Sequence, residues 1–518
     1  MAWDIRVATG RKVFATTASV VALTMALGAC SGTQSDSERL QRFYDQKLVF
    51  ASCDGYATTA SDEKAFADPR FECGRLEVPR DYADPGGATM RIAVLKVPAR
   101  GERIGSLLLN PGGPGGPGMG MAAAAATTWA QSRLSERFDL VGFDPRGVGA
   151  SSPSVRCYSD AEDDSGAAVF PTAATVGRFT ESDTRAVVDR CAKGSGGREA
   201  LAHLGTRDAA RDMDILRAAV GDTKLSYFGQ SYGTRLGAVY AELFPDRVRA
   251  MVLDGGIDPT TGTSERRISQ FTSFQRAFDA MAADCVTRPD CPLGTDASQA
   301  VTEFQGIVRP LLDHPIPAGD NRIADYPLAV GSVIAGLYDS AVWPVITAGL
   351  AQIRTGHGDT LRKIGDAFGG RGADGRWPNI ADANYAINCM DEQRHSPEQE
   401  TDLRRDIYRV APFLDPGRGA DGARDGCEFW PATPTLGYPY ATGIKGLPPT
   451  LTISITGDPA TPYEGGLKLA AALGGTALTV EGNQHTVAFA ATSACVNKAV
   501  EDYLVELRSP TADTRCKL

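Results

Sequence analysis

One serine of the chain lies in a pentapeptide that is suited to build a nucleophile. Residues 229–233 read Gly-Gln-Ser-Tyr-Gly, and they stand between an apolar run, LSYF, and a helical pattern. A serine on a sharp turn from a strand to a helix has a strained backbone, and small residues two positions away on either side make room for that turn. Its hydroxyl then projects above the sheet, beside a helix N-terminus that favours negative charge. We therefore predict that Ser231 is a catalytic nucleophile.

A serine hydroxyl needs a base, and the base needs a carboxylate that orients it. When a serine occupies a turn of this kind, the acid and then the histidine follow it along the chain. Of the five histidines, His485 alone follows the last predicted strand; the other four precede the serine or lie in a region without predicted sheet strands (His203, His314, His357 and His395). The predicted acid is Asp458, at the end of the run LTISITG. The alternative is Asp254, at the end of the preceding strand.

A Gly- and Pro-rich segment, NPGGPGGPGMG at residues 110–120, directly follows an apolar run. Acyl transfer passes through a tetrahedral oxyanion, which needs preorganised N–H donors. One donor follows the nucleophile, at Tyr232, and the other belongs to the loop after the third strand. Glycines let the backbone approach a substrate carbonyl closely, and prolines stiffen the loop. We therefore interpret the segment as an oxyanion loop, and a flexible linker is the alternative.

Alternating strand and helix patterns provide the frame for these residues. Parallel strands buried on both faces lack regular polar alternation, as the central runs do. Between them lie helical patterns such as 206–221, for which we expect Thr206 as N-cap and Gly221 as the stop. The order indicates an α/β sheet with right-handed crossovers. The strand predictions are 91–97, 106–110, 138–144, 225–230, 250–256, 451–457 and 477–482.

The alternation stops between about residues 260 and 445, where helical stretches and Pro/Gly-rich loops replace it. An insertion before the last strands would lie over the carboxyl edge of the sheet, where ligands bind in such folds, so we expect a helical cap. The predicted division of the chain is a signal peptide (1–29), a lipid-anchored polar tether (30–50), the first part of the core (51–260), the cap (261–445) and the C-terminal part of the core (446–518).

The N-terminus and the cysteines both indicate export. Basic residues precede a short apolar stretch that ends in Leu-Gly-Ala-Cys, which resembles a bacterial lipobox with Cys30 as the lipidated residue. The alternatives are a signal peptide cut near Ala29 or an uncleaved anchor. Ten further cysteines form an even set without a zinc-type spacing, which favours disulfides over metal ligation. We expect bonds between sequence neighbours: Cys53–Cys73, Cys157–Cys191, Cys285–Cys291, Cys389–Cys427 and Cys495–Cys516.

Several motifs resemble one family. NPGGPGGPG, DLVGFDPRGVGASSP, YFGQSYGTRLGAVYAELFPDRVRAMVLDG and TGDPATP…GNQHT are similar to the secreted tripeptidyl-aminopeptidase and proline-iminopeptidase group of α/β-hydrolases, above all to its actinobacterial members with a TAP-like C-terminal region. The resemblance covers roughly residues 70–510 and is thin in the cap. It implies an α/β-hydrolase fold and assigns the triad roles to Ser231, Asp458 and His485.

The resemblance also identifies the second oxyanion donor. Many relatives read His-Gly-Gly-Pro-Gly in this loop, and here Pro111 replaces the histidine, so the matching donor is the N–H of Gly113. The motif FDPRGVGAS matches a loop after the fourth strand, and we expect a structural pair of Asp144 with Arg146 there and no catalytic role.

These observations predict an exported serine aminopeptidase that releases short N-terminal units, tripeptidyl or prolyl, from peptides through an acyl-enzyme. The cationic amine of such a substrate requires a carboxylate in the cap, for which we expect Asp391 and, after it, Glu392. The alternatives are a carboxylesterase or lipase with the same triad, or a solute-binding lipoprotein without chemistry. The net charge of −10 argues against a nucleic-acid partner, the membrane is reached through the lipid alone, and no cofactor or metal is expected.

Overall fold

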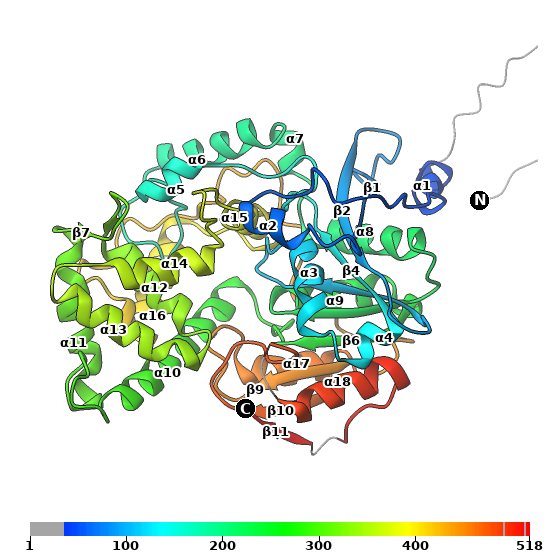
Figure 1. Cartoon of the computed structure of the whole chain (residues 1–518). Coiled ribbons are helices and arrows are strands. Elements are labelled where there is room, and N and C mark those ends of the chain that lie inside the picture. Colours follow the sequence, from blue (N-terminus) through cyan, green and yellow to red (C-terminus); the bar gives the residue numbers. More distant parts are fainter. Residues whose placement is uncertain (1–35, 491–492, 512–513) are drawn as a thin grey trace, which may run out of the picture. The chain divides into compact units, whose positions relative to one another are not determined.

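A nine-stranded sheet runs through the part of the protein that this computed structural model describes, residues 36–490, 493–511 and 514–518 (Figure 1). The strand order is β1-β2-β4-β3-β5-β6-β9-β10-β11. β2 pairs antiparallel with β1 and β4, and the other pairs are parallel. The strands are β1 (Glu72–Pro79), β2 (Thr89–Val97), β3 (Gly105–Asn110), β4 (Phe138–Asp144), β5 (Leu225–Gln230), β6 (Val248–Asp254), β9 (Leu451–Ile455), β10 (Thr476–Glu481) and β11 (Arg515–Lys517). All seven predicted strands are present.

Helices cover both faces of the sheet, as the unbroken apolar runs of the strands require. On β3, Leu108 belongs to one buried cluster, with residues of α8 and α9, whereas Leu107 and Leu109 belong to another, with residues of α3 and α18. Side chains that alternate between two apolar layers explain why these strands show no polar alternation. The helices around the sheet are α2 (Ala60–Ala65), α3 (Gly118–Thr128), α4 (Arg133–Arg137), α8 (Thr206–Ala219), α9 (Tyr232–Leu243), η1 (Pro245–Arg247), α17 (Tyr463–Ala472) and α18 (Ala494–Glu506).

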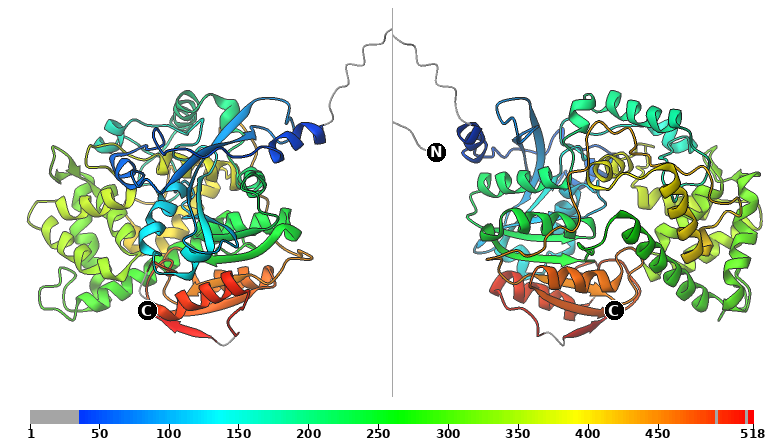
Figure 2. Two further views of the ribbon diagram at one scale, coloured as in Figure 1. Left: turned by 45° about the vertical axis from the view of Figure 1, so that its right-hand side comes forward. Right: turned by 180° about the vertical axis from the view of Figure 1, so that it is seen from behind.

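The residues between β6 and β9 form the predicted helical insertion, which lies to one side of the sheet in all views (Figures 1 and 2). It has an apolar core of its own, which contains Phe278, Phe304 and Phe413. The boundaries of 261–445 stay a prediction. Its elements are α10 (Thr263–Cys285), η2 (Ala297–Gln299), α11 (Ala300–Val308), η3 (Arg309–Leu312), β7 (Ile316–Pro317), β8 (Ile323–Ala324), α12 (Tyr326–Gly336), η4 (Ser340–Val342), α13 (Trp343–Ile353), α14 (Asp359–Gly369), α15 (Ile380–Asp391), α16 (Pro397–Val410) and η5 (Pro412–Leu414).

A second helical segment outside the sheet was not predicted from the sequence. Between β4 and α8 lie α5 (Asp160–Ser165), α6 (Glu181–Gly194) and α7 (Arg198–Leu201), which approach the insertion in Figure 1. We predicted Thr206 as the N-cap of α8, but the N-cap is Gly205. Thr206 is the first helical residue, and its N–H donates to a carboxylate of the insertion, Asp391, at 2.9 Å. A distant side chain therefore supplies the cap that a local one was expected to give.

The N-terminal predictions have two outcomes. The signal peptide over 1–29 and the lipidation of Cys30 lie outside the described residues. Within the predicted tether over 30–50, residues 36–44 form helix α1 (Asp36–Tyr44), and the tether otherwise stays a prediction. Phe43 is buried in the core beside α8, and the Tyr44 hydroxyl donates to a carboxylate of that helix at 2.7 Å. Within 36–490, 493–511 and 514–518, none of the helices combines the length and apolarity that crossing a membrane requires.

The ten cysteines of the described residues are joined in the five predicted pairs of sequence neighbours. The motif after β4 differs from its prediction. Arg146 is fully buried, but it pairs with Asp212 of α8, at 2.6 and 2.7 Å, and not with Asp144. Asp144 instead accepts the backbone N–H groups of Met119 and Ala150. The two side chains are structural, each with its own partners.

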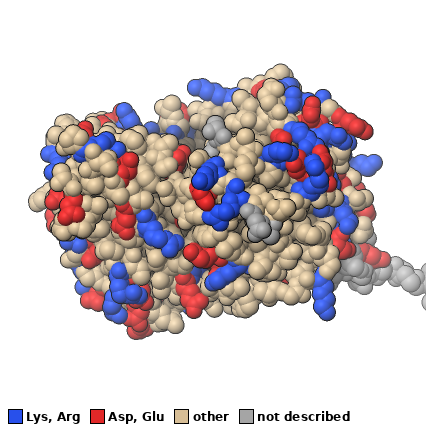
Figure 3. Space-filling model, turned by 90° about the horizontal axis from the view of Figure 1, so that it is seen from below, with Lys and Arg blue, Asp and Glu red and all other residues tan. Residues whose placement is uncertain are grey.

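Charges of both signs are mixed on the surface. Figure 3 shows the molecule from below the view of Figure 1, and on this side Lys and Arg lie among Asp and Glu. Pairs such as Lys498–Asp502 (2.6 Å) on α18 and Arg515–Glu481 (3.0 Å) between β11 and β10 are exposed. Exposed pairs of this kind contribute little to stability, about 0–1 kcal/mol each.

Candidate active site

The predicted nucleophile stands at the turn from β5 to α9. Ser231 has φ 54° and ψ −123°, a strained conformation for a residue with a side chain, and its N–H donates to the Asp254 carbonyl at 2.8 Å. A Cβ atom on Gly229 would lie 2.6 Å from the Gly233 carbonyl oxygen, so only glycine fits there. The G-x-S-x-G spacing therefore has the predicted steric cause.

The Gly- and Pro-rich loop lies against this turn. Gly112 has φ 93°, and a Cβ there would lie 2.4 Å from the Gln230 carbonyl oxygen and 3.0 Å from the Tyr232 nitrogen. The loop is held in place, since the Gly112 N–H donates to Asn110 Oδ1 at 3.0 Å. Tyr232 is the first residue of α9, where backbone N–H groups have no partner within the helix. Gly113 and Tyr232 line the same cavity as Ser231.

The structure brings His485 and Asp458 together. The Nδ1 atom of His485 lies 2.9 and 3.0 Å from the two carboxylate oxygens of Asp458, which is buried. The carboxylate is fixed by three more hydrogen bonds, from the N–H groups of Ala460 (2.9 Å) and Thr461 (2.8 Å) and from the Thr461 hydroxyl (2.9 Å). On the other side of the ring, Nε2 is buried without a hydrogen-bond partner in the described part of the chain.

The alternative acid, Asp254, has a different position. Its Oδ2 atom accepts the N–H groups of Val487 and Ala488, both at 2.9 Å, and the Gln230 side chain at 3.2 Å. Asp254 thus connects the turn before Ser231 to the loop after His485. Its carboxylate is within electrostatic range of the imidazole, but no hydrogen bond joins the two among the described residues.

The pKa of His485 is the result of opposing effects. Burial by itself lowers the pKa, because it disfavours the charged imidazolium. The charge of Asp458 and its hydrogen bond, together with the charge of Asp254, outweigh burial, so the pKa is raised above its ordinary value. A histidine with a raised pKa is suited to act as a general base near neutral pH.

A cavity of about 780 Å³ opens beside the serine. One side is formed by the oxyanion loop and the nucleophile turn, with Gly113, Ser231 and Tyr232. The other sides come from the insertion, from the α5 region and from the loop after β9, which contribute aromatic, charged and small residues. Further residues of the cavity wall include Asp163, Arg266, Arg267, Tyr338, Phe368, Trp377, Asp382, Glu392 and Glu464.

Neither acid that we predicted for substrate-amine binding is free. Asp391 is fully buried and is not among the cavity-lining residues; its oxygens accept the N–H (2.9 Å) and hydroxyl (2.5 Å) of Thr206. Glu392 lines the cavity but pairs with Arg266 and, at 2.8 Å, with Arg267. Burial alone would raise the pKa of Glu392, but the two guanidinium groups lower it to about 2. The prediction for Asp391 therefore needs correction: it caps a helix.

Two other carboxylates of the cavity wall were missed. Asp382 of α15 is buried, and Asp163 of α5 is partly buried; neither forms an ion pair within the described residues. Burial, with the repulsion of neighbouring carboxylates, raises the pKa of Asp382 to about 7 and that of Asp163 to about 6. No sequence motif distinguishes them, because they come from segments more than 200 residues apart that only the fold brings together.

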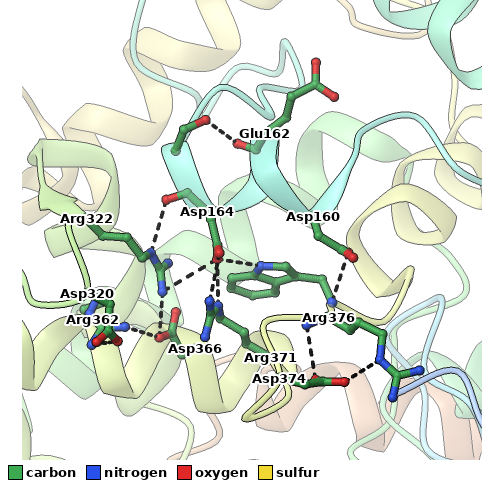
Figure 4. A network of polar contacts seen from close by, with 12 residues as sticks. Asp160, Glu162, Asp164, Asp320, Arg322, Arg362, Asp366, Arg371, Asp374 and Arg376 are labelled. Carbon is green, nitrogen blue, oxygen red and sulfur yellow. Dashed lines mark hydrogen bonds and ion pairs between the residues drawn. The ribbon is translucent and has the colours of Figure 1, made fainter. Parts of the chain in front are cut away.

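The wall that carries Asp163 is tied to the insertion by a polar network (Figure 4). Asp164 accepts two hydrogen bonds from Arg371, at 2.7 and 2.8 Å, and one from the Trp377 indole at 2.9 Å. Arg322 and Arg362 share Asp366 at 2.9 and 2.8 Å. The network positions α5 and the loop before α15, and with them this end of the cavity.

Comparisons with known proteins agree with this geometry. A family model described as alpha/beta hydrolase fold matches residues 105–490. The serine protease Hip1 of Mycobacterium tuberculosis is 42% identical over 456 residues, which are 86% of this chain and 87% of that protein. Carboxylesterase B of M. tuberculosis is 41% identical over 86% of each chain. The tripeptidyl aminopeptidase of Streptomyces lividans is 32% identical over 86% of this chain and 83% of that protein.

Proposed function

This chain belongs to the alpha/beta hydrolase fold family, and from that premise we propose that it is an exported serine aminopeptidase that releases short N-terminal units, tripeptidyl or prolyl, from peptides. The relatives named as a serine protease and a tripeptidyl aminopeptidase support a serine hydrolase that acts on peptides. The observation that carries the proposal is the hydrogen bond of His485 Nδ1 to Asp458 beside a cavity that the strained Ser231 lines.

In the proposed reaction, Ser231 attacks the carbonyl carbon of the scissile bond. Its proton passes to Nε2 of His485, and Asp458 holds the imidazole with its proton on Nδ1 and stabilises the cation that forms. The N–H groups of Gly113 and Tyr232 bind the oxyanion. His485 then protonates the leaving amine, and an acyl-enzyme remains. In the second half of the reaction His485 takes a proton from water, which attacks the acyl-enzyme, and returns a proton to Ser231.

For the substrate amine we propose Asp382 and Asp163 in place of Asp391 and Glu392. An ammonium group in a partly desolvated cavity requires a carboxylate that is not already neutralised by arginine. Asp382 and Asp163 meet this requirement on the cavity wall, and a bound cation would offset the burial and the repulsion that raise their pKa values. Glu392 does not meet it, because two arginines already occupy its carboxylate.

The test uses a panel of chromogenic substrates. Tripeptide and prolyl substrates are each supplied with a free and with an N-acetylated amine, and short-chain esters are measured beside them. We expect the wild type to prefer free amines, and Ser231→Ala to lose both turnover and labelling by a fluorophosphonate probe. Asp382→Asn should raise KM for free-amine substrates and leave that for esters unchanged. Glu464→Gln, which removes an exposed carboxylate at the cavity wall, is the matched control. Equal rates on free and acetylated peptides would contradict the aminopeptidase.

A carboxylesterase is the second candidate, because Carboxylesterase B is nearly as similar to this chain as the serine protease is. A Ser-His-Asp site attacks esters as well as amides, so the fold does not decide between them. Ester turnover without any cleavage of free-amine peptides, in the same panel, would favour this candidate.

Export and lipid anchoring are further parts of the proposal. Five disulfides among the described residues are typical of an oxidising compartment. The lipobox-like sequence before Cys30 suits attachment to the outer side of the membrane. We expect the wild type in the membrane fraction, and Cys30→Ala to lose the lipid and leave that fraction. An N-terminal peptide of the wild type without a lipid on Cys30, by mass spectrometry, would contradict a lipid anchor.

A further inference from the structure

Two aromatic residues of the cavity wall lie close to the imidazole of His485. The Tyr338 ring lies edge-on to the His485 ring, with centroids 5.0 Å apart and an angle of 88° between the planes. Tyr338 also contacts Phe368, again with centroids 5.0 Å apart and an angle of 61°. Tyr338 and Phe368 line the same cavity as Ser231. The aromatic wall, Tyr338 with Phe368, therefore leads from the catalytic histidine along the cavity.

The backbone fixes this wall relative to the histidine. The His485 N–H donates to the Tyr338 carbonyl at 2.8 Å, and Asp339 and Gln484 form an antiparallel bridge. A segment of the insertion is thus paired with the loop that carries the histidine. A pocket edge that is fixed in this way is preorganised, and binding to it costs little conformational entropy.

Phe368 is unusually exposed for its type. Its exposed fraction is 56%, although it stands at the C-terminal end of α14 and lines the cavity. Large apolar side chains that remain open to a cavity are typical of binding sites. Val345 on α13 is similarly exposed, at 44%, but does not line the cavity, so it offers a comparison without a nearby site.

The chemistry decides which part of the substrate reaches the aromatic wall. In acylation the bond from Ser231 Oγ to the carbonyl carbon forms and the carbon–nitrogen bond breaks. The serine proton moves to Nε2 of His485 and from there to the leaving nitrogen. The leaving amine is therefore next to His485 when the bond breaks, and the chain that begins with it lies along the side on which Tyr338 and Phe368 stand.

We propose that Tyr338 and Phe368 form the subsite for the residue directly after the scissile bond, and that this subsite selects large apolar or aromatic side chains. The proposal rests on the proposed acyl-enzyme function. Stacked or edge-on aromatic contacts and burial of the exposed Phe368 surface would supply the selectivity. The wall contacts the leaving peptide alone, so its effect is limited to acylation and is absent from hydrolysis of the acyl-enzyme.

The test uses peptides with one common N-terminal part, in which the residue after the scissile bond is Phe, Leu, Gly or Asp. The cleavage position is verified by mass spectrometry. For the wild type we expect the highest kcat/KM with Phe and Leu. Phe368→Ala should lower kcat/KM about tenfold for these two and change it less than twofold for Gly. An ester with the same acyl part should keep its rate of deacylation. Val345→Ala should behave as the wild type.

Each contrary outcome has a distinct meaning. An equal loss on all four peptides, or a dependence on the acyl part, would overturn the assignment of Phe368 to the leaving side. A slower deacylation of the ester in Phe368→Ala would overturn it as well. Unchanged fluorophosphonate labelling in Ser231→Ala would refute the proposed function itself. Circular dichroism and thermal unfolding of Phe368→Ala verify that the fold is retained, which we expect because alanine favours helices and the site is exposed.

Discussion

Replacing Asp458 by asparagine separates the two candidate acids. Oδ1 of Asp458 accepts two backbone N–H groups, those of Ala460 and Thr461, at 2.9 and 2.8 Å. An asparagine at this position would keep its carbonyl oxygen there, because two donors require an acceptor. Its NH₂ group would then take the place of Oδ2, 3.0 Å from Nδ1 of His485.

That orientation favours the wrong tautomer. The carbonyl oxygen at the Oδ1 position would lie 2.9 Å from Nδ1 but would already accept two N–H groups, whereas the NH₂ group can only donate to Nδ1. When the NH₂ group donates, the imidazole proton lies on Nε2, and Nε2 can no longer accept the proton of Ser231. In a triad this change costs on the order of 10⁴ in turnover, or about 5.4 kcal/mol of transition-state stabilisation. Binding of a non-reacting peptide should change little, because Asp458 is buried behind the histidine.

Asp254→Asn provides the comparison. Its Oδ2 atom accepts the N–H groups of Val487 and Ala488, whereas Oδ1 is buried without a partner among the described residues. The asparagine would keep its oxygen toward the N–H groups and place its NH₂ group at the unpaired position. We expect a loss of less than about tenfold, since the histidine keeps its tautomer.

The assay is the pH dependence of kcat/KM for a free-amine peptide with both variants. The neutral imidazole is the base, so activity rises with pH through the pKa of His485, which is raised above its ordinary value. Removing the charge of Asp254 lowers that pKa, so the acidic limb of the Asp254→Asn profile should move to lower pH. A severe loss of kcat/KM in Asp254→Asn, together with almost unchanged kcat/KM in Asp458→Asn, would refute the assignment of Asp458 as the acid.

Three further predictions concern the elements around the site. Gly112→Ala should abolish turnover with little loss of expression, because its Cβ would lie 2.4 Å from a carbonyl oxygen beneath the oxyanion loop; steady-state rates and fluorophosphonate labelling measure this. Asp391 binds Thr206 at the N-terminus of α8, so Asp391→Asn should cost about 1 kcal/mol in the free energy of unfolding and lower the melting temperature. The preference for free amines should not change. Replacing Cys389 and Cys427 by serine removes a disulfide between residues that are 38 positions apart in the sequence. This should cost about 3–4 kcal/mol in the free energy of unfolding, measured by denaturant titration.

These outcomes have clear opposites. A Gly112→Ala enzyme with normal kinetics would show that the loop does not hold an oxyanion donor. A selective rise of KM for free-amine peptides in Asp391→Asn would restore that residue as the amine ligand. An unchanged midpoint in the double serine variant would show that the unfolded chain gains little freedom from opening this link.

The sequence by itself determined the chemistry that depends on local steric rules and on chain order. The turn at Ser231 needs small neighbours at fixed positions, and strands buried on both faces need unbroken apolar runs, so both features are readable from the chain. His485 could be selected because the order of nucleophile, acid and base along the chain follows from the order of the strands. The preference for Asp458 over Asp254 rested on chain order, and the hydrogen bond of Nδ1 to Asp458 supports it.

Tertiary structure alone decided which charged groups of the cavity are free. Asp391 and Glu392 follow one another in the chain, yet one caps α8 from a distance and the other is neutralised by two arginines of α10. Asp382 and Asp163, by contrast, come from distant segments and share the cavity without ion pairs among the described residues. A carboxylate's availability depends on which cations lie within a few ångströms in space, and the spacing of residues along a chain does not contain that information.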